Sequence, residues 1–141
     1  MAAGSSVGED RARLTSRLGL RDDAVVLVVG WEDDGDEELL DSVSAHTAEV
    51  LMGDADDVVD AVLVWWRDDD GDLADGLLDA LSMLDDNGLV WLLTPRPGRT
   101  GHMSAAEVKE AVQVAGLQIT SSISVGADWQ AARLTAPKSG R

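Results

Sequence analysis

The chain has 141 residues, enough for one domain with a single hydrophobic core and too few for two. Its 27 acidic and 11 basic residues give a formal net charge of −16, which excludes a nucleic-acid binder working through a basic face and argues against binding to an anionic membrane. Because the sequence has no cysteine, disulfides, thiolate catalysis and cysteine-ligated metal sites are excluded too.

The first predicted elements are a helix, a strand and a second helix. Residues 9–19 are expected to form a short basic helix. The apolar, largely β-branched run at residues 24–29, which stops at Gly30, predicts a strand buried on both faces. A helix is predicted from Asp36, its N-cap, to Met52. Its apolar stripe comprises Leu39, Leu40, Val43, Val50 and Leu51.

The middle of the chain repeats this alternation of strand and helix. Residues 61–66 predict a second buried strand. Asp72 is expected to cap a helix that ends in a left-handed turn at Asn87-Gly88. The apolar stripe of that helix comprises Leu73, Leu77, Leu81 and Leu84. Residues 89–93 then predict a third strand.

The last elements are a well-signalled helix and a hairpin. Ser104 and Glu107 have the spacing of a capping box, and Gly116 is expected to end the helix that they begin. Residues 118–125 and 129–135 alternate in hydrophobicity on either side of a short turn, which predicts an antiparallel hairpin.

This order predicts a single three-layer, Rossmann-like α/β domain, with a mostly parallel five-stranded sheet and a C-terminal antiparallel hairpin. The domain is assigned to residues 9–137, with a disordered N-terminus at 1–8 and a disordered tail at 138–141. The closing hairpin is similar to that of Rossmann-like methyltransferases, although the chain is shorter by about two strand–helix units. With no signal peptide or membrane-spanning run, we expect a cytoplasmic protein.

Charged turns follow the predicted strands. Residues 22–95 hold 22 acidic residues and one basic residue, a net charge of −21 against +5 for the rest of the chain. The turns after the first two strands share the order Trp, one residue, an acidic run, Gly and Asp, and a basic loop follows the third strand. Because ligands of open parallel sheets bind beyond the carboxyl ends of the strands, we expect one binding rim there. Its candidate residues are Trp31, Asp33, Asp34, Asp36, Trp66, Arg67, Asp68, Asp69, Asp70, Asp72, Thr94, Arg96, Arg99 and His102.

Neither a cofactor nor a catalytic residue is predicted at this rim. S-adenosylmethionine or a dinucleotide needs a glycine-rich turn after the first strand, whereas the segment from Gly30 to Gly35 supplies bulk and negative charge. We favour the interpretation that the acidic turns are solvated and complement the helix dipoles. A magnesium or manganese ion held by their carboxylates is the alternative. The candidate metal ligands are Asp33, Asp34, Asp68, Asp69 and Asp70.

Three unusual runs of sequence carry a resemblance to a known family. Residues 60–73, 88–95 and 98–102 are similar to a family of small acidic actinobacterial proteins catalogued as a domain of unknown function. The resemblance covers about residues 10–138 and implies a cytosolic actinobacterial protein, but no activity. The chain has 20 Asp against 7 Glu and 9 Arg against 2 Lys, so codon bias of a GC-rich genome is an alternative source of the acidity.

The leading hypothesis for function is a non-catalytic binding or regulatory module whose acidic rim engages a basic protein partner. One alternative is an enzyme, either a divergent methyltransferase-like protein or a magnesium- or manganese-dependent one that uses the aspartate-rich loops. A further alternative is an acidic nucleic-acid mimic that occupies a DNA-binding partner. None of the three requires the chain to bind nucleic acid or a membrane directly.

Overall fold

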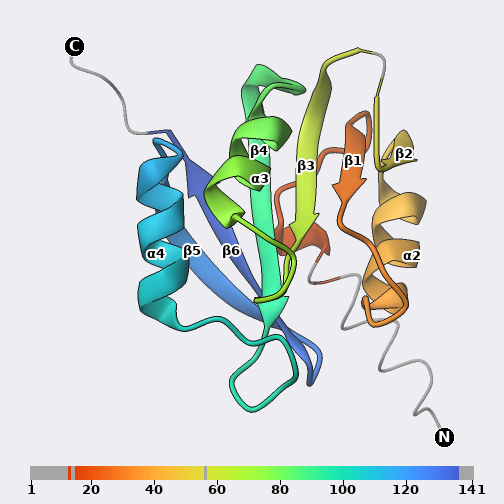
Figure 1. The fold of residues 1–141 in the computed structure, drawn as a ribbon. Coiled ribbons are helices and arrows are strands. Elements are labelled where there is room, and N and C mark those ends of the chain that lie inside the picture. Colours follow the sequence, from red (N-terminus) through yellow and green to blue (C-terminus); the bar gives the residue numbers. More distant parts are fainter. Residues whose placement is uncertain (1–12, 14, 56, 137–141) are drawn as a thin grey trace, which may run out of the picture.

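The computed structural model describes residues 13, 15–55 and 57–136, which form one mixed sheet with helices on both faces (Figure 1). The sheet order is β2-β1-β3-β4-β6-β5; the first four strands are parallel, and β6 runs antiparallel to β4 and β5. The strands are β1 (Val25–Val29), β2 (Glu49–Met52), β3 (Val59–Trp65), β4 (Leu84–Pro95), β5 (Gln118–Val125) and β6 (Trp129–Thr135). The helices are α2 (Glu37–His46), α3 (Leu73–Leu81) and α4 (Ala105–Val114).

Side chains of the central strands are buried on both faces of the sheet, as the continuous apolar runs predict. Val62 and Val64 of β3 belong to the cluster beneath α3 and α4. Leu63 and Trp65 belong to a second cluster, which includes Leu39 of α2. The α/β class is thereby confirmed, and the two clusters place the helices in separate layers on either side of the sheet.

The N-terminal helix expected over residues 9–19 lies partly outside the described residues. Residues 13 and 15–17 are helical, and Leu18 is buried in the same cluster as α2. The indole nitrogen of Trp91 in β4 donates to the carbonyl of Leu18 at 2.8 Å, which fixes this segment to the sheet. The ends expected to be disordered, 1–8 and 138–141, also lie outside the described residues.

The prediction of one helix over residues 36–52 is wrong, and so is the prediction of five strands. Helix α2 ends at His46, and the residues that follow form a sixth strand, β2, at one edge of the sheet. Val50 and Leu51 have a spacing compatible with the helical stripe. However, the backbone nitrogen of Ala48 donates to the carbonyl of Ala24 at 2.9 Å, which leads the chain into parallel pairing with β1.

The second helix also ends earlier than predicted. Leu84 continues the leucine spacing of α3, but it is the first residue of β4. The carbonyl of Met83 accepts a hydrogen bond from the backbone nitrogen of Val59 at 2.8 Å, so pairing with β3 begins there. Gly88 lies within β4 and does not have a positive φ, so the left-handed cap expected at this position is wrong.

The signals for the starts of the helices are confirmed. The side chain of Asp36 accepts from the backbone nitrogen of Leu39 at 2.9 Å, and that of Asp72 accepts from Ala74 at 3.0 Å. The capping box at the start of α4 and both strands of the C-terminal hairpin also have their predicted bounds. The N-caps matter for the site because each begins its helix directly after an acidic turn.

Candidate functional site

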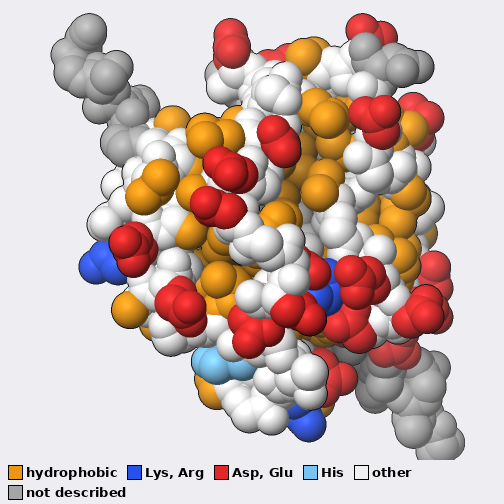
Figure 2. All heavy atoms as spheres, in the orientation of Figure 1, with side chains coloured by type: hydrophobic (Ala, Val, Ile, Leu, Met, Phe, Trp, Pro, Cys, Tyr) orange, Lys and Arg blue, Asp and Glu red, His pale blue; other side chains and the backbone are white. Residues whose placement is uncertain are grey.

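Two acidic turns lie together at the carboxyl ends of β1 and β3. These strands are neighbours and parallel, so residues 31–36 after β1 and residues 66–72 after β3 share one end of the sheet. Figure 2 shows acidic side chains gathered over this end. We call their carboxylates the acidic rim. It comprises Glu32, Asp33, Asp34, Asp36, Asp68, Asp69, Asp70 and Asp72.

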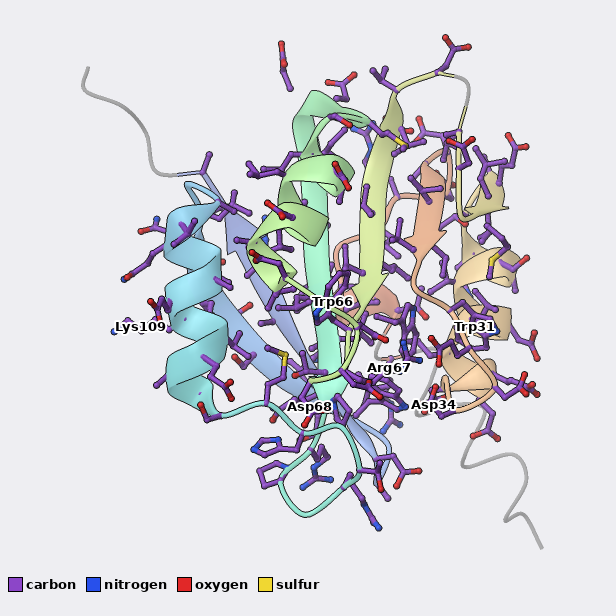
Figure 3. All side chains as sticks on the ribbon, viewed as in Figure 1. Trp31, Asp34, Trp66, Arg67, Asp68 and Lys109 are labelled. Carbon is purple, nitrogen blue, oxygen red and sulfur yellow. The ribbon has the colours of Figure 1, made fainter. Side chains whose placement is uncertain are left out.

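Arg67 joins the two turns from within. It is one of the candidate rim residues, and only 4% of it is exposed. Its Nε donates to Asp34 Oδ2 at 3.1 Å, and its Nη2 donates to Oδ1 of the same carboxylate. Its Nη1 donates to the carbonyl of Gly30 at 2.7 Å and to Asp70 Oδ2 at 3.3 Å. We call this arrangement, visible beside Asp34 in Figure 3, the Arg67 clasp.

The charge of Arg67 is secured by its partners. Burial by itself would lower the pKa of the guanidinium, but hydrogen bonds and charge from Asp34, the hydrogen bond from Asp70 and the charge of Glu32 outweigh that effect and raise the pKa. The group therefore stays charged at all ordinary pH values. Since the bidentate pair with Asp34 needs a planar fork of donors, lysine could not reproduce it.

A set of tryptophans supports the clasp. The Trp129 ring centroid lies 5.1 Å from Arg67 Cζ, and its indole nitrogen donates to the backbone carbonyl of Asp34 at 2.9 Å. Trp65 packs edge-on against Trp129, with 4.8 Å between the ring centroids, and against Trp31, with 5.1 Å between the ring centroids. The turn after β1 is thus held through both its backbone and its side chains.

The start of that turn requires glycine. Gly30 has a φ of +79°, and a Cβ at this position would lie 2.1 Å from the carbonyl oxygen of Trp65. The backbone of the turn therefore passes directly against β3, where only glycine can be accommodated. This close approach brings the Gly30 carbonyl within reach of Arg67 Nη1.

The basic loop after β4 reaches the same end of the sheet, as expected. The backbone nitrogen of Asp68 donates to the carbonyl of Gly101 at 2.9 Å, and Arg99 Nε lies 3.1 Å from Asp128 Oδ1 on the β5–β6 turn. A small pocket of about 190 Å³ lies between the acidic turn after β1 and these segments. It is lined by Asp34, Pro95, Arg99, Thr100, Asp128 and Trp129.

Other candidate residues of this loop are engaged within the fold. Arg96 Nη1 donates to the carbonyl of Gly126 at 3.1 Å, and His102 Nδ1 lies 2.9 Å from the carbonyl of Pro95. Thr94 is buried and lines a cavity of about 190 Å³ beneath α4. These contacts fix the shape of the loop, and they place Thr94 under α4.

The two candidate tryptophans take different positions. Trp31 is half-buried on the turn after β1, where it packs against Trp65 and covers Gly35. Trp66 is half-buried toward α3, and its ring lies so close to Gly76 that a Cβ there would be 2.5 Å away (Figure 3). Both rings therefore have a packing role.

The sequence reasoning missed the part that Trp129 takes in the site. With 3% exposure Trp129 belongs to the core, and it also contacts Arg67 and Asp34. The signal that could have placed it there is the hairpin register. Trp129 pairs with Pro95, the last residue of β4, so it must lie at the same end of the sheet as the acidic turns.

The described residues contain no group of three His, Asp or Glu side chains arranged to hold a metal ion. Of the proposed metal ligands, Asp34 and Asp70 bind the guanidinium of Arg67. In the same part of the chain, no helix has the length and apolar character needed to cross a membrane.

Comparison with known sequences places this chain in a family. A model described as a protein of unknown function, DUF3052, matches residues 15–138. The chain belongs to that family. Uncharacterized proteins of Mycobacterium tuberculosis (H37Rv) and Mycobacterium bovis are each 44% identical to it over 124 residues, which are 87% of this chain and 78% of theirs. The resemblance inferred from the three sequence runs is thereby confirmed.

Several solved structures similar to this family member are methyltransferases. CalO1, a methyltransferase in calicheamicin biosynthesis, has a TM-score of 0.64 at 15% identity over 92% of this chain and 54% of its own. A precorrin-6y C5,15-methyltransferase of Geobacter metallireducens has a TM-score of 0.60 at 13% identity, covering 92% of this chain and 88% of its own. The chain spans about half the length of several of these neighbours. At such identities the likeness establishes a Rossmann-like, methyltransferase-type fold and nothing further.

The CalO1 structure contains S-adenosylhomocysteine, so we tested whether this rim could hold such a group. In an open α/β sheet a nucleoside ligand lies against the turn after the first strand. Here the Arg67 guanidinium is bound to the Gly30 carbonyl in that turn. The pocket beside it holds about 190 Å³, whereas small-molecule sites usually exceed about 300 Å³. The residues present do not fit this cofactor.

Proposed function

We propose that this protein is a non-catalytic binding module whose acidic rim engages a basic surface on a protein partner. The observation that supports this most directly is the Arg67 clasp, which fixes two acidic turns on one surface while neutralising little of their charge. The two turns carry eight carboxylates and only one guanidinium, and that guanidinium is buried. The exposed acids are therefore available to a partner in a fixed arrangement.

A fixed acidic surface has two consequences for binding. Long-range attraction speeds the encounter with a basic partner, and this gain declines as salt shortens the Debye length from about 30 Å at 0.01 M to about 8 Å at 0.15 M. A surface that is already ordered also loses less conformational entropy on association. Association should accordingly be fast and sensitive to salt.

The test compares two triple variants of the full chain in affinity capture from host lysate. The rim variant carries Asp33→Asn, Asp68→Asn and Asp69→Asn, all at exposed positions. The matched control carries Asp41→Asn, Asp75→Asn and Asp79→Asn, which are exposed on α2 and α3 and change the net charge equally.

We expect basic partners to be captured by the wild type and the control, to be lost with the rim variant, and to be released between about 50 and 300 mM salt. Partners without a basic surface would refute the proposal. So would binding that both variants reduce equally, because general acidity rather than the rim would then be responsible.

Two alternatives have their own tests. An enzyme is the second candidate, suggested by the fold alone. Titration with S-adenosylmethionine, magnesium or manganese while tryptophan fluorescence and heat are recorded would reveal binding of the ligand, which the binding-module proposal does not expect. A nucleic-acid mimic is distinguished by competition, because DNA would then displace the chain from its captured partner.

A further inference from the structure

Strand β5 is an exposed edge of the sheet. Among the described residues it pairs only with β6, and it lies at the opposite edge from β2 (Figure 1). Six of its eight residues are exposed, while Ile123 is half-buried and Val125 is buried. The register shifts between Ile119 and Ser121, which leaves a regular segment from Ser121 to Val125. A row of backbone donors and acceptors along this segment is open to another strand.

Apart from the irregularity between Ile119 and Ser121, this edge lacks the features that usually block strand pairing. Natural edge strands are protected by charged side chains, proline or short length. Residues 111–127 contain no charged residue and no proline, in a chain where 27% of residues are charged. The other edge is protected: β2 has only four residues, and its first, Glu49, is exposed. The contrast within one sheet singles out β5 as the edge suited to pairing.

Exposed apolar side chains accompany the open edge. Val114 at the end of α4 is 67% exposed and Ile119 of β5 is 40% exposed. Isoleucine, serine and threonine side chains follow one another along the strand, and the β-branched ones favour extended pairing. Exposed apolar side chains therefore lie at the end of α4 and near the start of β5, the strand whose backbone groups are open.

We propose that β5 pairs antiparallel with β5 of a second copy of this chain, forming one continuous sheet through both. A two-fold contact of this kind uses the same surface on each copy. Charge favours a second copy over a strongly charged partner, because residues 111–127 offer no charge to attract a basic or an acidic surface. They also form the surface on which two chains of net charge −16 can approach with little repulsion.

The sheet order gives the distances that make this arrangement favourable. From β3 of one copy to β3 of the other there would be seven strand spacings of about 4.8 Å, or about 34 Å. That is roughly four Debye lengths at 0.15 M salt, so the two acidic rims would repel each other only weakly. Pairing through the β2 edge would bring them much closer.

Sedimentation equilibrium on the full chain tests the proposal. The wild type should be a dimer, and a Ser121→Lys, Ser124→Lys variant should raise the dimer dissociation constant by about 30-fold, because like charges oppose one another across the new strand pair. Both serines are exposed in the single chain, so the circular dichroism spectrum should not change, and neither should the Tm measured at concentrations where both proteins are monomeric. The matched control is Ser44→Lys, Ala45→Lys on α2, which should dimerise as the wild type does.

Hydrogen exchange supplies a second readout at the strand itself. Amides of residues 121–125 should gain protection as the concentration rises and lose it in the lysine variant. A wild type that stays monomeric well above micromolar concentration would overturn the proposal, as would a dimer that the lysine variant retains. Protection of β5 that appears only when another protein is added would also overturn it, since the occupant would then be a different chain.

Discussion

Replacing Arg67 with methionine should destabilise the fold substantially. Methionine keeps a long flexible chain but removes every donor of the clasp. Breaking a buried ion pair by removing one partner costs about 3–5 kcal/mol. Here the side chains of Asp34 and Asp70 are 53% and 22% exposed, so water can resolvate them in part. We therefore expect a loss of about 2–3 kcal/mol in the free energy of unfolding.

The assay is urea and thermal unfolding followed by the fluorescence of the five tryptophans, one of which is the ring beside the clasp. For a chain of 141 residues the unfolding entropy is about 0.3 kcal/mol/K, so the expected fall in Tm is about 7–10 °C. Arg99→Met is the control, because Arg99 pairs with Asp128 and both side chains are more than half exposed. That exposed pair should contribute no more than about 0.5 kcal/mol.

A double-mutant cycle isolates the pair itself. Arg67→Met, Asp34→Asn and their combination should give a coupling energy of about 1–2 kcal/mol, because both groups belong to one hydrogen-bond network. A coupling below about 0.5 kcal/mol, or an Arg67→Met loss no larger than that of the Arg99 control, would refute the reasoning. Arg67→Lys should recover little, since lysine lacks the planar fork.

Three further predictions concern the turn after β1, the N-terminal segment and the charge of Arg67. Gly30→Ala should lower the free energy of unfolding by at least about 3 kcal/mol or prevent folding, because its Cβ would lie 2.1 Å from a backbone oxygen. Gly53→Ala is the control: Gly53 has a similar φ of +83° and open space around it, so the loss should be only about 1 kcal/mol in the same urea unfolding assay. Trp91→Phe removes the 2.8 Å hydrogen bond to the Leu18 carbonyl, so it should lower the free energy of unfolding by about 1–2 kcal/mol and speed proteolysis of the N-terminal segment. The Asp34 and Asp70 carboxylates hold the folded pKa of Arg67 above its ordinary value, so its stabilisation is fully present below the unfolded pKa and is lost only as the pH rises through the folded value. The difference in unfolding free energy between wild type and Arg67→Met should thus stay constant from about pH 6 to 10 when measured by urea unfolding.

Elements whose ends are marked by local capping or turn residues could be predicted from the sequence. Ser104 and Glu107 satisfy each other's backbone groups locally, and the C-terminal hairpin contains its own turn, so neither depends on distant contacts. The errors arose where tertiary pairing overrides a local pattern. Val50 and Leu51 match a helical stripe as well as a strand, and only the hydrogen bonds offered by β1 decide between the two.

The meeting of the two acidic turns was predictable, but the position of Arg67 was not. Parallel neighbouring strands must bring both turns to one end of the sheet. The order of tryptophan, acidic run and glycine occurs in both turns, which indicates that the two turns occupy equivalent positions after their strands. The burial of Arg67 depends on Asp34, which lies 33 residues earlier, and on the carbonyl that Gly30 presents. Since no local period records such a contact, an arginine between acidic residues is easily taken for an exposed one.

The clasp fixes the geometry of the rim but changes its charge little. One guanidinium cannot neutralise eight carboxylates, so its effect on the rim is to hold two turns together while a net charge of about −7 remains between them. Changes at Asp33, Asp68 or Asp69 alter the charge that a partner meets, because none of these side chains lies in the clasp. Changes at Arg67 or Gly30 alter the placement of the turns. A partner that recognises charge alone should tolerate changes at Arg67 or Gly30 in proportion to the folded fraction. A partner that recognises the shape of the rim should lose affinity even when an uncharged osmolyte restores folding.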